Sequence, residues 1–418
     1  MKAVMLAALG VVATGAFGEV VETNRINVTN RSSNDIRMFG AREGGAPREN
    51  AAAIQRAIDA AAENCGRVVV PAGTFVSGTL WLKSGVTLHL DRGAVLKASD
   101  DLADYNAEDA YPENFGCPKS EYWRGLHFII CRGQKDVAIE GEGTIDGNGD
   151  AFFEEKPKAY FPWMKSGSAA WWNGIRWAKD KEKLRPGQLV VFVKCEDVTV
   201  KGITIHNSPC WSLFFHGCRN VTVRDYTVRN GPDDGNTDGV DLDCVSNATL
   251  ENLDIDTGDD AIAIRAVPRR LQLPEPPPCE NITIRNAKLR STSSVFRLGV
   301  GDGLIRNVTV ENVVSDRGGT AIMMDTLYGE PESGYGEPES GGVDMENIVF
   351  RNCRFDNCRF AYSIWTAGRR LEFGVRDVTF ENCTFPKGVP RRVGGDANCR
   401  FRPVWIRTGE ASSNAPQE

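Results

Sequence analysis

A short phrase recurs along the chain and constrains its fold more than any other feature. Each copy places Asn or Asp ahead of alternating apolar and polar residues, as in "RNVTVRD", "ENITIRN" and "RDVTFEN". Counted at this Asn or Asp, the copies lie at residues 136, 197, 220, 247, 281, 307, 347 and 377, with shortest spacings of 23, 26 and 27 residues. Such alternation is typical of a strand with one buried face. Strands that recur at a near-constant period indicate a solenoid.

The repeat therefore predicts an all-β chain, a right-handed parallel β-helix with two or three strands in each coil. Helical periodicity is nearly absent after residue 64, and the stretch "NAAAIQRAIDAAAENCG" (50–66) predicts one N-terminal helix. We expect this helix to cap the stack, since an uncapped end would offer unpaired strand edges. Because a solenoid grows along one axis, a long chain can remain a single domain.

The first 18 residues, "MKAVMLAALGVVATGAFG", have the pattern of a secretory signal peptide: one lysine, an apolar run, and small residues at the cleavage spacing. We therefore expect a single β-helix domain over residues 19–418, secreted or periplasmic and monomeric. The net charge of −7 argues against nucleic acid and anionic membrane as partners. Loop insertions are predicted near residues 104–130, 150–187, 267–279 and 327–343.

Twelve cysteines in an exported chain allow disulfides, and Cys210–Cys218 and Cys353–Cys358 are nearby candidate pairs. Several cysteines recur at one phase of the repeat, so the alternative is that they fill the core. Four histidines and the lack of a CxxC spacing argue against a zinc site. The repeat also generates Asn-x-Thr sequons, which we attribute to Asn at the turn and Thr in the strand rather than to glycosylation; they begin at Asn220, Asn247, Asn281 and Asn307.

Two turns, "NTDG" and "TGDD", place aspartates directly before similar strands. Aligning Val240 with Ile262 makes Asp238 the neighbour of Asp260, one coil and 22 residues apart, with Asp259 beside them. Coils stack at about 4.8 Å, so we expect the three carboxyl groups to meet. Like charges at such distances raise the pKa of one carboxyl, and glycoside cleavage uses one protonated acid and one base. An acidic turn alone is usually only a turn, so the hypothesis depends on this alignment.

The same register extends to the next coils. Ser294 and then Thr320 follow Asp260, and the outward-facing positions of the strands that come after these turns are Asp241, Asp243, Ala263, Arg265, Arg297, Met323 and Asp325.

Several longer phrases, among them "VVVPAGTFVSGTLWLKSGVTLHLDRGAVLKAS", "IEGEGTIDGNG", "NSPCWSL", "NTDGVDL" and "TGDDAIAIRA", resemble glycoside hydrolase family 28, the polygalacturonase family, over about residues 36 to 385. The resemblance implies a right-handed parallel β-helix that hydrolyses α-glycosidic bonds of pectin-type polysaccharide, or of its oligosaccharides, with inversion. It implies Asp259 as the general acid, and Asp238 with Asp260 as the pair that holds and activates water. Asn236 would orient the site or a sugar hydroxyl. No metal or other cofactor is implied.

Two motifs of that family are absent. The His of its Gly-His-Gly motif falls on Ser294, and the Arg and Lys of its Arg-Ile-Lys motif fall on Met323 and Asp325. By their positions, Ser294 and Asp325 are predicted to bind substrate, together with Asn236, Arg265 and Arg297. Met and Asp cannot clamp a sugar carboxylate. Either Arg265 and Arg297 replace that clamp, or the sugar bound there is neutral, such as rhamnose or galactose. The alternative for both arginines is a salt bridge to a nearby aspartate, Asp241 or Asp243.

Two other functions stay open. One is a calcium-dependent β-helix polysaccharide lyase, in which the acidic cluster binds the ion and Arg265 or Arg297 is the base. The other is a non-catalytic carbohydrate-binding β-helix, although three aspartates in register favour hydrolysis.

Insertion 150–187 is rich in tryptophan. Its rings could stack on sugars in a groove closed at one end, which would favour exo action, or they could cover the core. They are Trp163, Trp171, Trp172 and Trp177.

Overall fold

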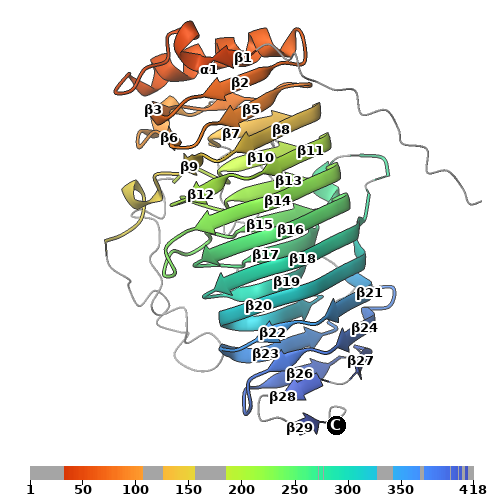
Figure 1. The fold of residues 1–418 in the computed structure, drawn as a ribbon. Helices are drawn as coiled ribbons and strands as arrows, with labels where there is room; N and C mark the ends of the chain where they lie inside the picture. The colour runs from red at the N-terminus through yellow and green to blue at the C-terminus, as the bar shows by residue number, and fades with distance from the viewer. Residues whose placement is uncertain are drawn as a thin grey trace, which may run out of the picture. The chain divides into compact units, whose positions relative to one another are not determined.

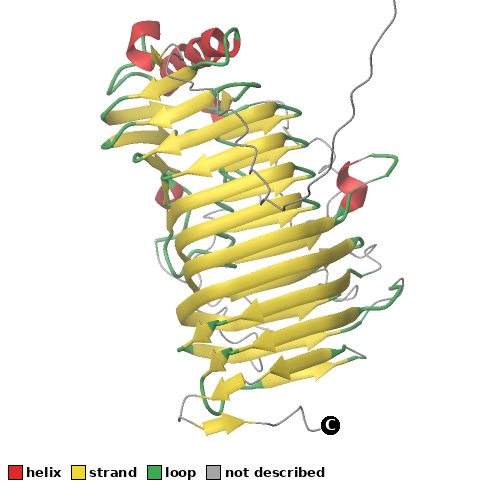
Figure 2. Cartoon of the chain, turned by 45° about the vertical axis from the view of Figure 1, so that its right-hand side comes forward, coloured by secondary structure: helices red, strands yellow, loops and turns green. Residues whose placement is uncertain are grey.

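The structure is a computed structural model and describes residues 33–106, 126–155, 185–271, 273–275, 277–326, 342–367, 371–395, 397–402, 404–406 and 410–412. In these residues the chain forms stacked coils of short parallel strands, the predicted right-handed parallel β-helix (Figures 1 and 2). The terminal hairpin β28–β29 is the one antiparallel pair among the described strands.

Each complete coil contributes three strands, so the strands form three rows. The row that carries the aspartates comprises β4 (Leu80–Trp81), β7 (Ile129–Arg132), β10 (Val190–Val193), β13 (Leu213–His216), β15 (Val240–Asp243), β17 (Ile262–Ala266), β19 (Ser294–Gly301), the end of β20 (Leu304–Asp325), β23 (Cys358–Trp365) and β26 (Arg391–Gly394).

The repeated phrases form the second row: β1 (Ser33–Asp35), β2 (Arg67–Val70), β5 (Thr87–Leu90), β8 (Lys135–Gly141), β11 (Glu196–Lys201), β14 (Arg219–Arg229), β16 (Ser246–Thr257), β18 (Cys279–Ser291), β20, β21 (Asp344–Arg351), β24 (Val375–Glu381) and β27 (Cys399–Arg402). The third row comprises β3 (Gly73–Ser77), β6 (Ala94–Ala98), β9 (Thr144–Asp146), β12 (Thr204–His206), the later parts of β14, β16, β18 and β20, then β22 (Arg354–Phe355), β25 (Thr384–Phe385), β28 (Val404–Ile406) and β29 (Glu410–Ser412).

The recurring Asn or Asp forms one corner of each coil. All eight of these residues adopt the left-handed backbone conformation, with φ between 52° and 61°, which Asn and Asp tolerate better than most residues with a side chain. The amide groups of Asn247, Asn281 and Asn307 each donate to the Asn one coil earlier, at 3.0–3.1 Å. This ladder accounts for the recurrence of Asn without invoking glycosylation.

Apolar side chains of the alternating strands face the interior and stack from coil to coil. One buried column in the second row consists of Val137, Val198, Val221, Ala248, Ile282, Val308, Ile348 and Val378. Aromatic rings continue the interior toward the C-terminus, with Phe350 and Phe380 stacked at 5.4 Å between centroids. Burial of these columns, at about 25 cal/mol per Å² of apolar surface, fixes the register of the coils and therefore the placement of the turns.

One α-helix, α1 (Pro47–Ala62), packs on the first coils at the red end of the ribbon in Figure 1. Ile54 and Ile58 on its inner face are fully buried in the common core, which confirms the predicted cap. The helix begins at Pro47 rather than at residue 50, because proline suits the first helical position. It ends at Ala62 rather than at residue 66, since Cys65 is left-handed. Short 3-10 turns lie at Ile36–Phe39, Leu102–Asp104, Gly149–Ala151 and Pro268–Leu271.

Neither candidate disulfide forms, because the eleven cysteines that the structure describes are all free thiols. Cys218 faces the interior, whereas Cys210 lies in a separate buried apolar cluster with Trp211 and Phe214. Cys353 and Cys358 both pack in the core. Most of these cysteines therefore act as small apolar side chains.

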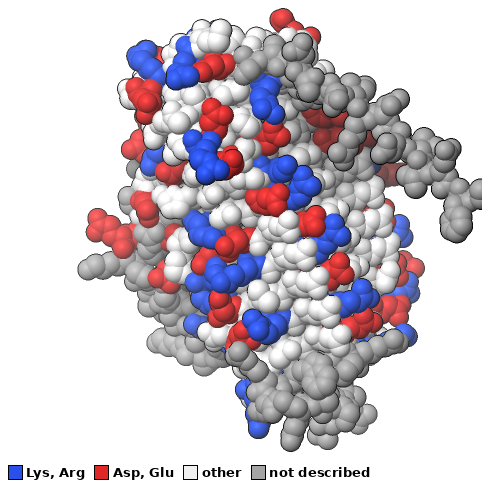
Figure 3. All heavy atoms as spheres, in the orientation of Figure 1, with Lys and Arg blue, Asp and Glu red and all other residues white. Residues whose placement is uncertain are grey.

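Several predicted features lie outside the described residues: the signal peptide, most of the insertions near 104–130, 150–187 and 327–343, and the four tryptophans of 150–187. Within the described part, no helix is long and apolar enough to span a bilayer. On the face shown in Figure 3, acidic and basic side chains are interspersed, without a broad region of one sign. Ion pairs also join neighbouring coils, for example Lys135 to Glu196 at 2.6 Å.

Candidate active site

Two consecutive coils bring the predicted aspartates together. In the pairing of β15 with β17, Val240 lies beside Ile262 and Leu242 beside Ile264, as the sequence alignment predicts. The same register continues into the preceding turns, where the Gly239 N–H donates to the carbonyl of Asp260 at 2.9 Å.

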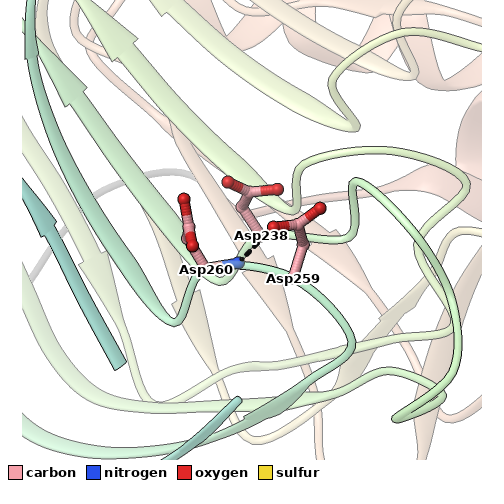
Figure 4. A group of neighbouring side chains, drawn as sticks. All are labelled: Asp238, Asp259 and Asp260. Carbon is pink, nitrogen blue, oxygen red and sulfur yellow. Dashed lines mark hydrogen bonds between the residues drawn. The ribbon is translucent and has the colours of Figure 1, made fainter. Parts of the chain in front are cut away.

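The three carboxyl groups converge just before these strands begin (Figure 4). One oxygen from each of Asp238, Asp259 and Asp260 lies within 4.8 Å of the other two. Each residue is buried, with 4–6% of its surface exposed. The two carboxyl groups of an inverting glycosidase usually stand about 6.5–9.5 Å apart, so this cluster is tighter than that spacing when measured between its nearest oxygens. The distance alone therefore does not assign the stereochemistry.

Hydrogen-bond donors surround two of the three carboxyl groups. Asp259 accepts from the backbone N–H groups of Asn236, at 2.9 Å, and of Asp260, at 3.0 Å. Asp260 accepts from the Ser293 hydroxyl at 2.9 Å and the Ser294 N–H at 3.0 Å. The Oδ1 atom of Asp238, in contrast, has no hydrogen-bond partner among the described residues. Donors favour the ionised form of a carboxyl, so Asp238 receives the least help in carrying a charge.

Burial dominates the protonation of this cluster. It raises the pKa of Asp259 to about 7, with a further contribution from the charge of Asp260, while the Asn236 N–H, Ser293 and Arg297 act in the opposite direction. Burial also raises the pKa of Asp238 well above its usual range, and the neighbouring aspartates add to it. The cluster therefore binds a proton near neutral pH, as acid–base hydrolysis requires. Burial therefore shifts both Asp238 and Asp259 toward the protonated form by raising their pKa values.

The outward-facing residues of β15 and β17, the two strands that follow the aspartate turns, are buried rather than exposed. Asp241 is fully buried, and neither of its carboxylate oxygens has a hydrogen-bond partner among the described residues. Arg265 is 3% exposed; its Nε lies 4.0 Å from Asp243 Oδ2 and its guanidinium lies over the Trp211 ring at 4.6 Å. Arg265 therefore forms the salt bridge of the alternative interpretation, in buried surroundings.

The other predicted substrate-binding residues have different surroundings. Ser294 holds Asp260 through its backbone N–H, and its hydroxyl lies 3.9 Å from the sulfur of Met323. Arg297 keeps 16% of its side chain exposed, with Nε 3.8 Å from Asp260 Oδ2. Asp325, two positions beyond Met323, accepts from Ser363 at 3.2 Å, and burial raises its pKa. Of these residues, Arg297 is the cation placed directly beside the aspartate cluster.

Asn236 is fixed by a residue that sequence reasoning missed. Arg185 donates to the Asn236 side-chain oxygen and to the Gly235 carbonyl, both at 2.9 Å. Ser293, a donor to Asp260, was also missed. No pattern marks either residue, since Arg185 is 50 residues from the turn in sequence and Ser293 lies in a run of similar hydroxyls.

The three carboxylates also have the oxygen donors and the spacing that a divalent cation would need. The hydrogen-bond donors directed at Asp259 and Asp260 also fit acid–base chemistry, because they position these two carboxyl groups without an ion.

Known proteins match both the sequence and the fold. The sequence profile of Glycosyl hydrolases family 28 matches residues 62–275. An endo-polygalacturonase of Pectobacterium carotovorum is 26% identical over 328 residues, 72% of this chain and 76% of that protein. An exo-poly-alpha-D-galacturonosidase of Dickeya chrysanthemi is 30% identical over 386 residues, 86% of this chain and 60% of that protein. The structure of a Yersinia enterocolitica family 28 exopolygalacturonase is similar with a TM-score of 0.64 at 20% identity, covering 91% of this chain and 76% of that one.

The structural likeness supports the β-helix alone, whereas the profile match spans half of the sequence and includes all three aspartates. The chain belongs to Glycosyl hydrolases family 28 and is a glycoside hydrolase.

Proposed function

We propose that this protein hydrolyses α-glycosidic bonds in galacturonate-containing pectic chains, with inversion at the anomeric carbon. The observation that carries the proposal is the meeting of Asp238, Asp259 and Asp260 on consecutive coils, where burial raises the pKa of Asp259 to about 7. Asp259 is the general acid, and Asp238 and Asp260 together bind and activate the attacking water. Relatives named for polygalacturonase activity, both endo and exo, support this substrate class.

Substrate binding can determine which carboxyl of the cluster carries the proton. A glycosidic oxygen that accepts a hydrogen bond from Asp259 favours the arrangement in which Asp259 carries the shared proton. Asp238, unprotonated in that arrangement and close to Asp260, then accepts a proton from water as it attacks. The chemistry needs only these carboxyl groups and water.

Arg297 is the residue that we propose for recognition of a galacturonate carboxylate. It lies one coil beyond Asp260 and retains exposure, whereas Arg265 is committed to Asp243. A charge-assisted hydrogen bond from a guanidinium to a carboxylate is strong and directional. One arginine would thus replace the two-residue clamp that the family resemblance leads us to expect.

A second candidate is cleavage next to a neutral sugar, as in rhamnogalacturonan. Met323 and Asp325 favour it, since they offer an apolar surface and an oxygen acceptor at the coil that follows Arg297. Burial raises the pKa of Asp325, so the repulsion of an anionic sugar by this residue weakens as the medium becomes more acidic.

The experiment compares homogalacturonan, rhamnogalacturonan and neutral galactan as substrates, with products identified by mass. We expect saturated uronate-containing products from the wild type and a loss of about 10²–10⁴-fold in rate for Asp259→Asn. Asp254→Asn is the matched control, because Asp254 lies in β16 outside the cluster and pairs with Arg229; its rate should stay near that of the wild type. Unsaturated products would indicate a lyase, and no release from any polymer would indicate a binding protein; either result overturns the proposal.

We also propose that the chain is secreted or periplasmic, on the strength of residues 1–18. N-terminal sequencing of the protein recovered outside the cytoplasm should find a chain that begins near Glu19. A full-length cytoplasmic protein would contradict this.

A further inference from the structure

Arg185 joins the segment before β10 to the turn that carries the catalytic aspartates. Its two terminal nitrogens donate to two successive residues of that turn, Nη1 to the Gly235 carbonyl and Nη2 to the Asn236 side-chain oxygen, both at 2.9 Å. Its guanidinium also lies 5.5 Å from the centre of the ring of Phe153, which is 1% exposed. A planar guanidinium with two donors engaged and a ring beneath it has a defined orientation.

The turn that Arg185 holds is in an uncommon conformation and supports the general acid directly. Asn236 has a φ of 56°, in the left-handed region. In that conformation its N–H points at Asp259 and donates to Oδ2 at 2.9 Å. Arg185 therefore acts on Asp259 through one intervening residue, and the position of the acid depends on how firmly the turn is held.

Arg185 also places a positive charge on the cluster. Arg297 lies beside Asp260, whereas the groups that Arg185 faces are the Cys210 thiol and the carboxyls of Asp259, Asp238 and Asp234. Asp259 is thus near both Arg297 and Arg185, and Asp238 is near Arg185. An opposite charge favours the ionised form of a carboxyl.

We propose that Arg185 is a positioning residue of the active site: it holds the Gly235–Asn236 turn so that Asp259 faces the glycosidic oxygen, and its charge favours the ionised forms of the neighbouring carboxyls. The proposal rests on the hydrolytic function proposed above. The proposal assigns a role to the end of insertion 150–187, and no sequence motif of the chain indicates that role.

The test compares Arg185→Lys and Arg185→Gln with the wild type on whichever of the three polymers the wild type hydrolyses fastest. Both variants should lower kcat, by about tenfold for Lys and about a hundredfold for Gln, because small misplacement of a catalytic group costs this much. KM should change less than about threefold, since Arg185 does not contact substrate. A rise in KM with kcat unchanged would make Arg185 a substrate-binding residue and overturn the proposal.

The pH profile separates positioning from general support of the fold. Loss of the charge in Arg185→Gln should move the profile of kcat/KM about one pH unit upward, because carboxyls without a nearby cation protonate more readily. Arg185→Lys keeps the charge and should keep the profile in place. Equal losses at every pH in both variants would show that Arg185 is merely structural.

A thermal measurement tests the proposal even if the wild type hydrolyses none of the polymers, a result that would refute the proposed function alone. Arg185→Gln should lower the Tm more at pH 8.5, where the carboxyls are ionised, than at pH 4.5, whereas Arg185→Lys should show a smaller dependence on pH. Arg56→Gln is the control and should show no such dependence, because Arg56 donates to the Phe39 carbonyl at 2.7 Å and forms no ion pair with a carboxylate among the described residues. A loss of Tm for Arg185→Gln that is the same at both pH values would overturn the role of the charge.

Discussion

Replacing Asp259 by asparagine should stabilise the protein at alkaline pH while it abolishes hydrolysis. The pKa of this carboxyl is raised from 3.8 to about 7 on folding, first by burial and then by Asp260. The folded protein thus binds this proton more tightly than the unfolded chain does. The stability associated with the protonated carboxyl is fully present below pH 3.8 and is lost as the pH rises through about 7. Asparagine does not titrate, so it escapes this loss.

The size of the effect follows from the two pKa values. Their difference, 7 minus 3.8, corresponds to about 4 kcal/mol, of which about 3 kcal/mol should develop between pH 4.5 and pH 8.5. A constant cost opposes it: asparagine has one acceptor oxygen, whereas Asp259 accepts from two backbone N–H groups. An unpaired buried N–H costs about 1–3 kcal/mol. We therefore predict how the difference in unfolding free energy between Asp259→Asn and the wild type changes with pH, and not the absolute value of that difference.

Thermal unfolding of the two proteins at pH 4.5, 6.5 and 8.5 measures this change. With an unfolding entropy of about 2.1 cal/mol/K per residue, 3 kcal/mol corresponds to about 4 °C in Tm for a chain of this length. The Tm of Asp259→Asn relative to the wild type should rise by that amount from pH 4.5 to pH 8.5, and Asp254→Asn should show no such trend. A difference that is constant with pH, or that falls as the pH rises, would refute the assignment of a raised pKa to Asp259.

Three further predictions follow from the same contacts. The kcat/KM of the wild type should fall above about pH 7, the pKa of Asp259; a profile flat to pH 9 would mean that Asp259 is not the acid. Arg297→Gln should raise KM for a uronate-containing substrate about 10–100-fold through loss of a charge-assisted hydrogen bond, with Arg297→Lys intermediate; an unchanged KM would remove Arg297 from substrate binding. Asn281→Ala should lower stability by about 2 kcal/mol, because it breaks the ladder and because alanine tolerates the left-handed conformation less well than asparagine, whereas Asn281→Gly should cost less in strain and both should keep full activity. An Asn281→Ala protein as stable as the wild type would show that the ladder contributes little.

The fold and the meeting of the aspartates could be predicted because both depend on local periodicity. A strand that alternates apolar and polar residues has only one register that keeps its apolar side chains inside the coil. Aligning Val240 with Ile262 therefore determined where Asp238 and Asp260 would lie, and the strand pairing confirms it. The corner residues were predictable for the same reason, since Asn and Asp recur where the backbone must turn left-handed.

The surroundings of the site could not be predicted, because they come from contacts between segments without a repeat. The sequence left open whether Arg265 binds substrate or forms a salt bridge, and the Trp211 ring and Asp243 lie against that side chain. Arg185 reaches the site from the end of an insertion, and no periodicity relates an insertion to a coil. Pairing cysteines by proximity in sequence failed likewise, since Cys210 and Cys218 lie on opposite sides of the sheet.

The configuration of the first sugar released is the most direct test of the proposed mechanism. The aspartate oxygens lie within 4.8 Å of one another, close to the spacing of about 5–5.5 Å at which a carboxylate acts as a nucleophile and the configuration is retained. If Asp238 and Asp260 instead direct a water molecule, proton NMR recorded within the first minutes of cleavage should detect the β anomer from an α-linked substrate. Initial release of the α anomer would contradict the mechanism proposed here.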